Sequence, residues 1–215
     1  MSNNLEFFKT NGYLVKENLI DQRLIRKINK IVSEVITKEK KKKHKVNGTQ
    51  SYNNYHFVYN SNNSKNKEIL RLNNPQNRHK IFYQLSRNKK IISIAKKLLG
   101  GTVRFHLGKL NFKLPNKKKG SEIGWHQDWA FYPHTNDDLI TVSIYLDDWY
   151  EKNGPLKIIK NSHKKKLYSH HNKENYFVGK IDTKKNKIGA NNSVSITGTA
   201  GTVVFFHCRS VHGSG

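Results

Sequence analysis

The sequence predicts an α+β protein in which helices in the first hundred residues precede a mainly β core of short strands. Apolar residues recur at helical spacing from Gln22 to about Ile36 and from Asn88 to Leu99. Beyond Gly101 the pattern changes to short alternating runs separated by turn residues, which is typical of β barrels and jelly rolls. We therefore expect one domain over residues 1–215, with a helical part up to about residue 100 and the β core after it.

The helical part is expected to contain three segments and a long loop. A short helix should end near Gly12 and pass into an extended segment, and Asp21 is placed to cap the helix that follows it. Residues 38–66 are rich in Lys, Asn, Ser and Tyr without periodicity, which indicates a surface loop. The last helix should stop at Gly100. Its expected core-facing residues are Ile91, Ile92, Ile94, Ala95 and Leu98.

In the β part, the clearest strand covers residues 139–146, where two sets of side chains alternate with period two. We expect the aliphatic set to point into the core. A turn at residues 151–155 then leads into a strand at 156–159, and a later strand covers residues 201–207. The aliphatic set is Ile140, Val142, Ile144 and Leu146, and the other set is Leu139, Thr141, Ser143 and Tyr145.

The formal net charge of +25 suggests a nucleic-acid or anionic membrane partner, but its composition argues against one. The excess is almost all lysine, 33 against 7 arginines; it accompanies 26 asparagines and is spread along the chain. Phosphate recognition favours arginine, whose planar fork matches phosphate oxygens. We attribute the charge to the codon bias of an AT-rich genome and expect no nucleic-acid partner. The densest run, Lys38–Lys45, is either an anion contact or a solvated loop.

Compartment can also be predicted from the sequence. No apolar run approaches the roughly 20 residues that cross a bilayer, and the first residues lack the pattern of a secretory signal. A single cysteine, Cys208, excludes an internal disulfide framework. We therefore expect a soluble, cytoplasmic protein without a membrane span.

The candidate metal ligands lie in the segment GWHQDWAFYPH, residues 124–134. His126 and Asp128 are two residues apart, so on an extended chain their side chains face the same way. A histidine from a distant strand, for which His212 is the candidate, would complete the two-histidine, one-carboxylate triad that binds Fe(II). The spacing alone is weak, because about one such pair is expected by chance. The alternative is a hydrogen-bonded barrel histidine followed by a turn residue.

Three separated blocks give this pair a context. The first is WHQD at 125–128 with Asp138-Leu139-Ile140, the second runs from Asn153-Gly154-Pro155 to Lys164, and the third joins 201–207 to 211–215. In their order along the chain and in their local sequence, these blocks resemble the phytanoyl-CoA dioxygenase family of Fe(II)- and 2-oxoglutarate-dependent oxygenases. The resemblance covers nearly the whole chain and is weakest between residues 38 and 66. It implies a double-stranded β-helix core, the cupin-like jelly roll, with His126, Asp128 and His212 as iron ligands.

The activity implied by the resemblance is hydroxylation of a small organic substrate, with O2 as oxidant and oxidative decarboxylation of 2-oxoglutarate to succinate and CO2. Lys113 matches a family lysine that meets the far carboxylate of 2-oxoglutarate, although it is also readable as an exposed strand lysine. Ser214, two residues after His212, is a second candidate for that carboxylate. Ile144 is the candidate for lining the cosubstrate pocket, where some members carry a larger aromatic residue.

One departure from the family pattern leaves alternatives open. The family usually places an arginine about ten residues beyond the distal histidine, where it clamps the far carboxylate. This sequence stops at Gly215, and Arg209 precedes His212 in an expected turn, so we do not assign it that role. We expect a truncated oxygenase domain that lacks the last core strands. A non-catalytic basic binding protein and an inactive truncated paralogue remain alternatives, and the sequence selects neither a substrate nor an oligomeric state.

Overall fold

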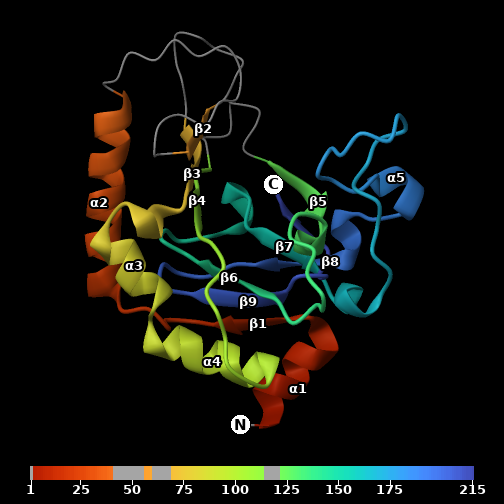
Figure 1. Ribbon diagram of the computed structural model, residues 1–215, viewed down its shortest axis with the longest axis horizontal. Helices are drawn as coiled ribbons and strands as arrows, with labels where there is room; N and C mark the ends of the chain where they lie inside the picture. Colours follow the sequence, from red (N-terminus) through yellow and green to blue (C-terminus); the bar gives the residue numbers. More distant parts are fainter. Residues whose placement is uncertain (1, 41–55, 60–68, 114–121) are drawn as a thin grey trace. The chain divides into compact units, whose positions relative to one another are not determined.

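The computed structural model describes residues 2–40, 56–59, 69–113 and 122–215 (Figure 1). The chain forms two compact units. None of the helices in the described ranges is long and apolar enough to cross a membrane. The first unit comprises Met1–Asp21, Ser93–Val103 and Glu122–Gly215, and the second comprises Gln22–Ile92 and Arg104–Ser121.

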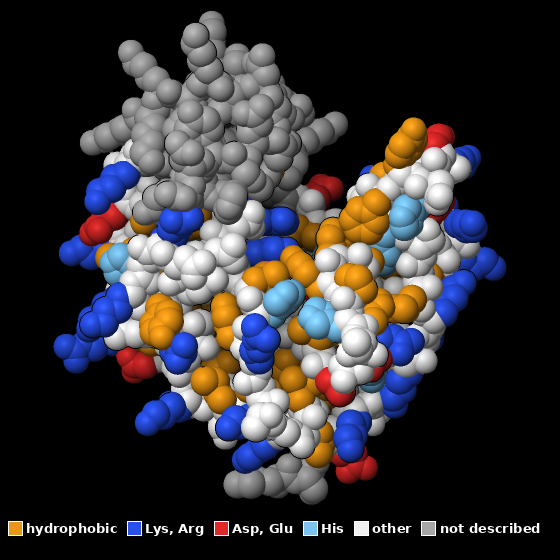
Figure 2. All heavy atoms as spheres, viewed as in Figure 1, with side chains coloured by type: hydrophobic (Ala, Val, Ile, Leu, Met, Phe, Trp, Pro, Cys, Tyr) orange, Lys and Arg blue, Asp and Glu red, His pale blue; other side chains and the backbone are white. Residues whose placement is uncertain are grey.

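Lysine and arginine side chains are scattered over the described surface shown in Figure 2 and do not form a single stripe on that face. This distribution matches the expectation from the sequence that the positive charge is dispersed. Most of the run Lys38–Lys45 lies outside the described residues. The same holds for residues 41–55 and 60–68 of the expected loop.

The first unit contains two antiparallel sheets. One has the strand order β1-β9-β6 and the other has the order β5-β10-β7-β8. Strands far apart in sequence are therefore neighbours in both sheets, as in a sandwich with crossing connections. The strands are β1 (Tyr13–Lys16), β5 (Ile123–His126), β6 (Ile140–Ile144), β7 (Leu156–Ile159), β8 (Ser193–Ile196), β9 (Val203–His207) and β10 (His212–Ser214).

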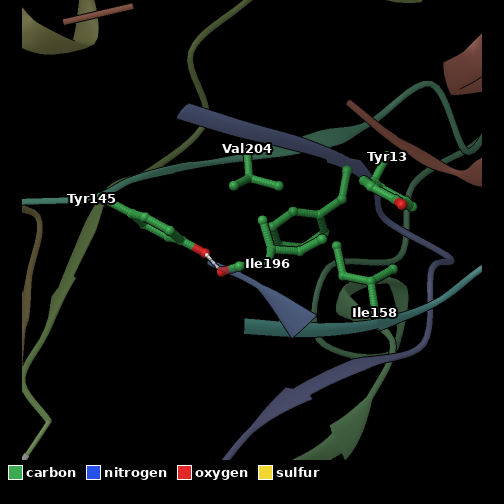
Figure 3. Packing of buried hydrophobic residues seen from close by; sticks show 6 residues of the cluster. Tyr13, Tyr145, Ile158, Ile196 and Val204 are labelled. Atoms are coloured by element: carbon green, nitrogen blue, oxygen red, sulfur yellow. Dashed lines mark hydrogen bonds between the residues drawn. The ribbon is translucent and has the colours of Figure 1, made fainter. Parts of the chain in front are cut away.

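Buried residues from both sheets form the core of this unit (Figure 3). Ile158 and Val204 are fully buried, one on each sheet, so the two sheets share one apolar interior. Within it the Tyr145 hydroxyl donates a hydrogen bond to the carbonyl oxygen of Ile196 at 2.6 Å, which satisfies a polar group that burial would otherwise penalise. The cluster consists of Tyr13, Tyr145, Ile158, Ile196, Val204 and Phe206.

The orientation predicted for strand β6 is wrong. Thr141 is the register partner of Phe206, and Tyr145, on the same face as Thr141, belongs to the core cluster. The aliphatic set of the strand, including Ile144, therefore faces away from the interior that the two sheets share. Ile144 pairs with the fully buried Val203, so this second face is covered too. When both faces of a strand are covered, period-two alternation does not specify which face meets the other sheet.

The helices follow the sequence prediction more closely. Helix α1 (Ser2–Asn11) ends at Gly12, whose φ of +80° favours glycine, and strand β1 follows. Helix α4 (Lys89–Leu99) begins with the Asn88 side chain accepting the Lys90 amide N–H at 2.9 Å and ends at Gly100. The shorter helical segments of the first unit are η2 (Asp128–Ala130), η3 (Glu151–Asn153), η4 (Ser162–Lys164), α5 (Thr183–Asn186) and η5 (Ala190–Asn192).

The second unit combines helices with a small antiparallel sheet of order β2-β3-β4. Helix α2 (Gln22–Lys40) runs about one turn beyond the predicted end at Ile36, and its Val35 and Ile36 pack on a cluster around Leu72. Strand β2 lies inside the segment predicted as loop. The other elements are β2 (His56–Tyr59), β3 (Ile69–Asn73), β4 (Lys109–Asn111), η1 (Pro75–Asn77) and α3 (Lys80–Ser86). The chain thus has helices and antiparallel sheets, as the sequence predicts.

Candidate metal centre

Three side chains converge where strands β5 and β10 pair. His126 is the last residue of β5, Asp128 opens η2 two residues later, and His212 is the first residue of β10. His126 and His212 are register partners in this antiparallel pair, so their side chains lie on the same face. The structure thereby brings together the three residues that the sequence singles out.

The distances between their polar atoms suit a shared metal ion. Oδ1 of Asp128 lies 3.6 Å from Nε2 of His126 and 3.8 Å from Nε2 of His212. One ligand atom from each residue lies within 4.8 Å of the others. Atoms bound to one ion at about 2.0–2.2 Å lie roughly 3.0–3.6 Å apart, so a small closing movement of these side chains would bring all three to one ion.

Hydrogen bonds fix both imidazoles so that Nε2 faces this point. Nδ1 of His126 lies 2.8 Å from the carbonyl oxygen of Gly124, and Nδ1 of His212 lies 2.9 Å from that of Ser210. A carbonyl oxygen only accepts, so each Nδ1 carries a proton and Nε2 is the ring nitrogen left to bind a metal ion. Metal-binding histidines in proteins are oriented in this way.

Asp128 is similarly restrained. The Thr141 hydroxyl donates to Oδ2 of Asp128 at 2.5 Å, which leaves Oδ1 directed toward the two imidazoles. Burial raises the pKa of Asp128, but His212, His126 and the Thr141 hydroxyl together outweigh it and hold that pKa well below its usual range. The carboxylate is therefore anionic and oriented at neutral pH.

His212 is the most buried of the three residues, with 6% of its side chain exposed. Its ring packs 4.6 Å from that of Phe206 and 4.1 Å from that of His126, measured between centroids. Burial, with the neighbouring His126, lowers the pKa of His212 to about 4. The imidazole of His212 is therefore neutral at pH 7, and the donor set consists of the two imidazoles and the Asp128 carboxylate. This set fits a divalent transition metal such as Fe(II).

Two residues of this region were missed by sequence reasoning. Thr141 was assigned to the outer face of its strand, and the wrong orientation of β6 hid its contact with Asp128. Gln127 lies between the two ligand candidates, and its side chain is fully buried. Its position in the WHQD block is the signal that could have drawn attention to it.

The other predicted site residues are distributed as follows. Ser214 lies on β10 on the same face as His212, as expected from their spacing, and pairs with Leu156. Lys113 belongs to the second unit, is half-buried and follows β4. Ile144 lies on the face of β6 opposite Thr141, and its place in the cosubstrate pocket stays a prediction. Arg209 lies in the turn before β10, where its guanidinium bonds Asp137 Oδ2 at 2.9 Å.

An aromatic cluster borders the centre. The ring of Phe131 meets that of His126 edge-on at 5.6 Å, and the ring of Phe177 meets Phe131 in the same way at 5.2 Å. Both phenylalanines are large apolar side chains that remain partly exposed to solvent. An exposed apolar surface beside a group of polar side chains is typical of a small-molecule site.

A set of two imidazoles and one carboxylate that converge on one point is typical of the mononuclear non-haem iron oxygenases. The family of phytanoyl-CoA dioxygenases (PhyH) matches residues 8–215. The chain therefore belongs to this family.

Curated relatives and solved structures agree with that membership. A probable alpha-ketoglutarate-dependent hypophosphite dioxygenase of Stutzerimonas stutzeri is 37% identical over 171 residues, covering 78% of this chain and 59% of the relative. An ectoine dioxygenase of Bordetella parapertussis is 31% identical over 153 residues, covering 62% of this chain and 48% of the relative. The chain thus spans about half the length of these relatives. The crystal structure of EctD from S. alaskensis with bound Fe has a TM-score of 0.77 at 22% identity, covering 100% of this chain and 70% of that one.

Proposed function

We propose that this protein is an Fe(II)- and 2-oxoglutarate-dependent dioxygenase that hydroxylates a small organic molecule. The observation that carries the proposal is the convergence of two Nδ1-anchored imidazoles and one anionic carboxylate, His126, His212 and Asp128. Family membership supports it, as does the description of the hypophosphite and ectoine relatives as dioxygenases. We also propose that the two sheets belong to a double-stranded β-helix and that residues 1–215 form one oxygenase domain.

In this proposal each residue of the centre has a distinct task. His126, Asp128 and His212 would hold the iron, and Thr141 would keep Asp128 turned toward it through the hydrogen bond to Oδ2. A set of three protein ligands leaves coordination positions for 2-oxoglutarate and O2. Iron, when bound, supplies the activation of O2 coupled to decarboxylation of 2-oxoglutarate to succinate and CO2. Lys113 and Ser214 are proposed contacts for the far carboxylate of 2-oxoglutarate.

The substrate is proposed to be a small molecule bound beside the aromatic cluster. Phe131 and Phe177 offer apolar surface next to His126, which would exclude water from one side of the reacting group. The names of the two relatives, hypophosphite dioxygenase and ectoine dioxygenase, also refer to small molecules. The single cysteine supports the further proposal of a reducing, cytoplasmic compartment.

The direct test is anaerobic titration of the purified chain with Fe(II) and 2-oxoglutarate, with the visible charge-transfer band of the chelate as the signal. We expect the band in the wild-type protein and its loss in His126→Ala. His134→Ala is the matched control, because His134 is exposed in the same segment and outside the triad. A wild-type protein without the band, or a band that survives His126→Ala, would contradict the assignment.

A further inference from the structure

Gln127 occupies an unusual position between His126 and Asp128. Neighbouring residues of an extended chain point to opposite sides, so its side chain leaves the metal centre and enters the protein, where it is fully buried. Its amide nitrogen donates to the carbonyl oxygen of Arg209 at 2.8 Å and approaches that of Lys166 at 3.4 Å. Its amide oxygen accepts the Tyr168 amide N–H at 2.9 Å. One side chain thus joins strand β5 to two other segments.

The backbone of Gln127 is held as well. Its amide N–H donates to Nε2 of His170 at 2.9 Å, and Nδ1 of His170 lies 2.9 Å from the Tyr168 carbonyl oxygen. Both ring nitrogens of His170 are therefore used, with Nδ1 as donor and Nε2 as acceptor. His170 is itself buried, so Gln127 is fixed from its backbone and from its side chain.

The Arg209 carbonyl is one peptide unit from the group that orients His212. Arg209 and Ser210 are consecutive residues of the turn between β9 and β10, and the Ser210 carbonyl oxygen is the partner of His212 Nδ1 at 2.9 Å. A shift of the Arg209 carbonyl therefore displaces the hydrogen-bond acceptor of His212. The side-chain amide of Gln127 opposes such a shift, and Gln127 lies directly between the other two ligand candidates, at the end of β5 and the start of η2.

Strand β10 pairs regularly with β7 over three residues, including His212 with Ile158, but its pairing with β5, which sets His212 relative to His126, is short and irregular. The register between β5 and β10 has only two Cα partner pairs, His212 with His126 and Ser214 with Ile123, and it shifts between them. Such an irregularity leaves part of the ladder unpaired and lets one strand move relative to the other. The hydrogen bond from Gln127 to the Arg209 carbonyl adds a third connection between the β5 segment and the β10 segment, close to the His126–His212 pair.

We propose that Gln127 is a positioning residue that sets His212 relative to His126 and Asp128 by joining β5, the 166–170 segment and the turn before β10. The proposal deepens the proposed function, since it assigns a residue that builds the iron site without touching the iron. Supporting residues of this kind change metal affinity about 10- to 100-fold when they are replaced.

The test compares Gln127→Met, which keeps the length of the side chain and removes its three hydrogen bonds, with Tyr145→Phe. The control removes one buried hydrogen bond from the core of the same unit. Tyr145 lies four residues beyond Thr141, about 13 Å along an extended strand. Gln127→Glu serves as a second variant that retains the acceptor for Tyr168 N–H if the methionine variant does not fold.

Two readouts separate positioning from stability. Co(II), used as a spectroscopic probe, reports affinity and ligand geometry through its visible bands, and long-range proton–nitrogen NMR of the metal-free protein reports the His212 tautomer. We expect the Gln127 variants to lose about 10- to 100-fold in Co(II) affinity and to mix the two tautomers of His212. Tyr145→Phe should lower the unfolding temperature and leave both readouts at their wild-type values.

The possible failures point to different proposals. Wild-type Co(II) binding that is unchanged in the folded Gln127 variants, with His212 still in the Nδ1–H form, would overturn the positioning role. Changes of equal size in Tyr145→Phe would overturn it too, because they would reflect stability alone. A wild-type protein that binds no Co(II), while the Gln127 variants still shift the His212 tautomer, would support the positioning role and remove the iron site.

Discussion

The rings of His126 and His212 face each other across strands β5 and β10, with centroids 4.1 Å apart and each Nδ1 bonded to a backbone carbonyl. Two imidazoles held this close with their Nε2 atoms toward one carboxylate form a preorganised donor set. The cost of ordering the ligands is therefore met largely during folding.

Thr141→Val should weaken metal binding by about tenfold, because it removes the hydroxyl that turns Asp128 while keeping the shape of the side chain. The measurement is the dissociation constant for Co(II) by visible titration. Ser143→Ala is the matched control, since Ser143 is the next residue on the same face of β6. Equal affinities for Thr141→Val and the wild-type protein would show that the Asp128 carboxylate needs no such partner.

Acid should destabilise the metal-free protein below about pH 6.5. Burial lowers the pKa of His163, His170, His207 and His212 in the folded state, the last to about 4, whereas the unfolded histidines titrate near 6.5. Below pH 6.5 the unfolded chain therefore binds more protons, and stability is lost as the pH falls toward the folded pKa values. His212 alone would account for about 3 kcal/mol of the free energy of unfolding that is lost between neutral pH and pH 4.

Urea unfolding at several pH values measures this loss. His212→Gln should reduce the change in the free energy of unfolding between pH 6.5 and 4, because it removes the histidine whose pKa in the folded protein is about 4. A profile that is flat in the wild-type protein over this range would contradict the burial of neutral histidines.

Gly12→Ala should lower the free energy of unfolding by about 2–5 kcal/mol. Gly12 has φ +80°, and an added Cβ would lie 2.4 Å from Nδ1 of His163 and 2.7 Å from Oγ of Ser210. Gly100→Ala is the control, because Gly100 has φ +77° with nothing within 4 Å, and it should cost only about 1–2 kcal/mol. Chemical denaturation measures both variants. Equal losses in the free energy of unfolding for Gly12→Ala and Gly100→Ala would show that the contacts of the added Cβ with His163 and Ser210 cost nothing.

Cys208 should resist thiol reagents at neutral pH while the protein is folded. Its side chain is fully buried, and burial is the main reason that the pKa of the thiol is raised to about 12. Labelling followed by mass spectrometry should show no modification in native buffer and complete modification in urea. Rapid native labelling would place the β9–β10 turn in solvent, contrary to the contacts that hold it.

The sequence predicted the three members of the candidate centre because strand spacing determines their convergence. His126 and Asp128 needed only the period of an extended chain, and His212 was added by the resemblance of its block. The ends of α1 and α4 were also predictable, since Gly12 and Gly100 both adopt positive φ. These features depend on short stretches of sequence.

The features that were missed depend on tertiary pairing. The face of β6 that meets the other sheet is fixed by its register with β9, which places Thr141 opposite Phe206, and the sequence of β6 alone does not contain that information. The contacts of Gln127 with Lys166 and Arg209 join residues 39 and 82 positions away. Strand β2 lies in a polar segment whose composition indicates a loop, and it is stabilised by pairing with β3.

The carbonyls that orient the two histidines lie two residues before each ring, at Gly124 and Ser210. The direction of each ring therefore depends on the backbone of two short segments, residues 124–126 and 210–212. A change of backbone conformation in either segment would turn a ring away from the shared point without altering any of the three ligand side chains.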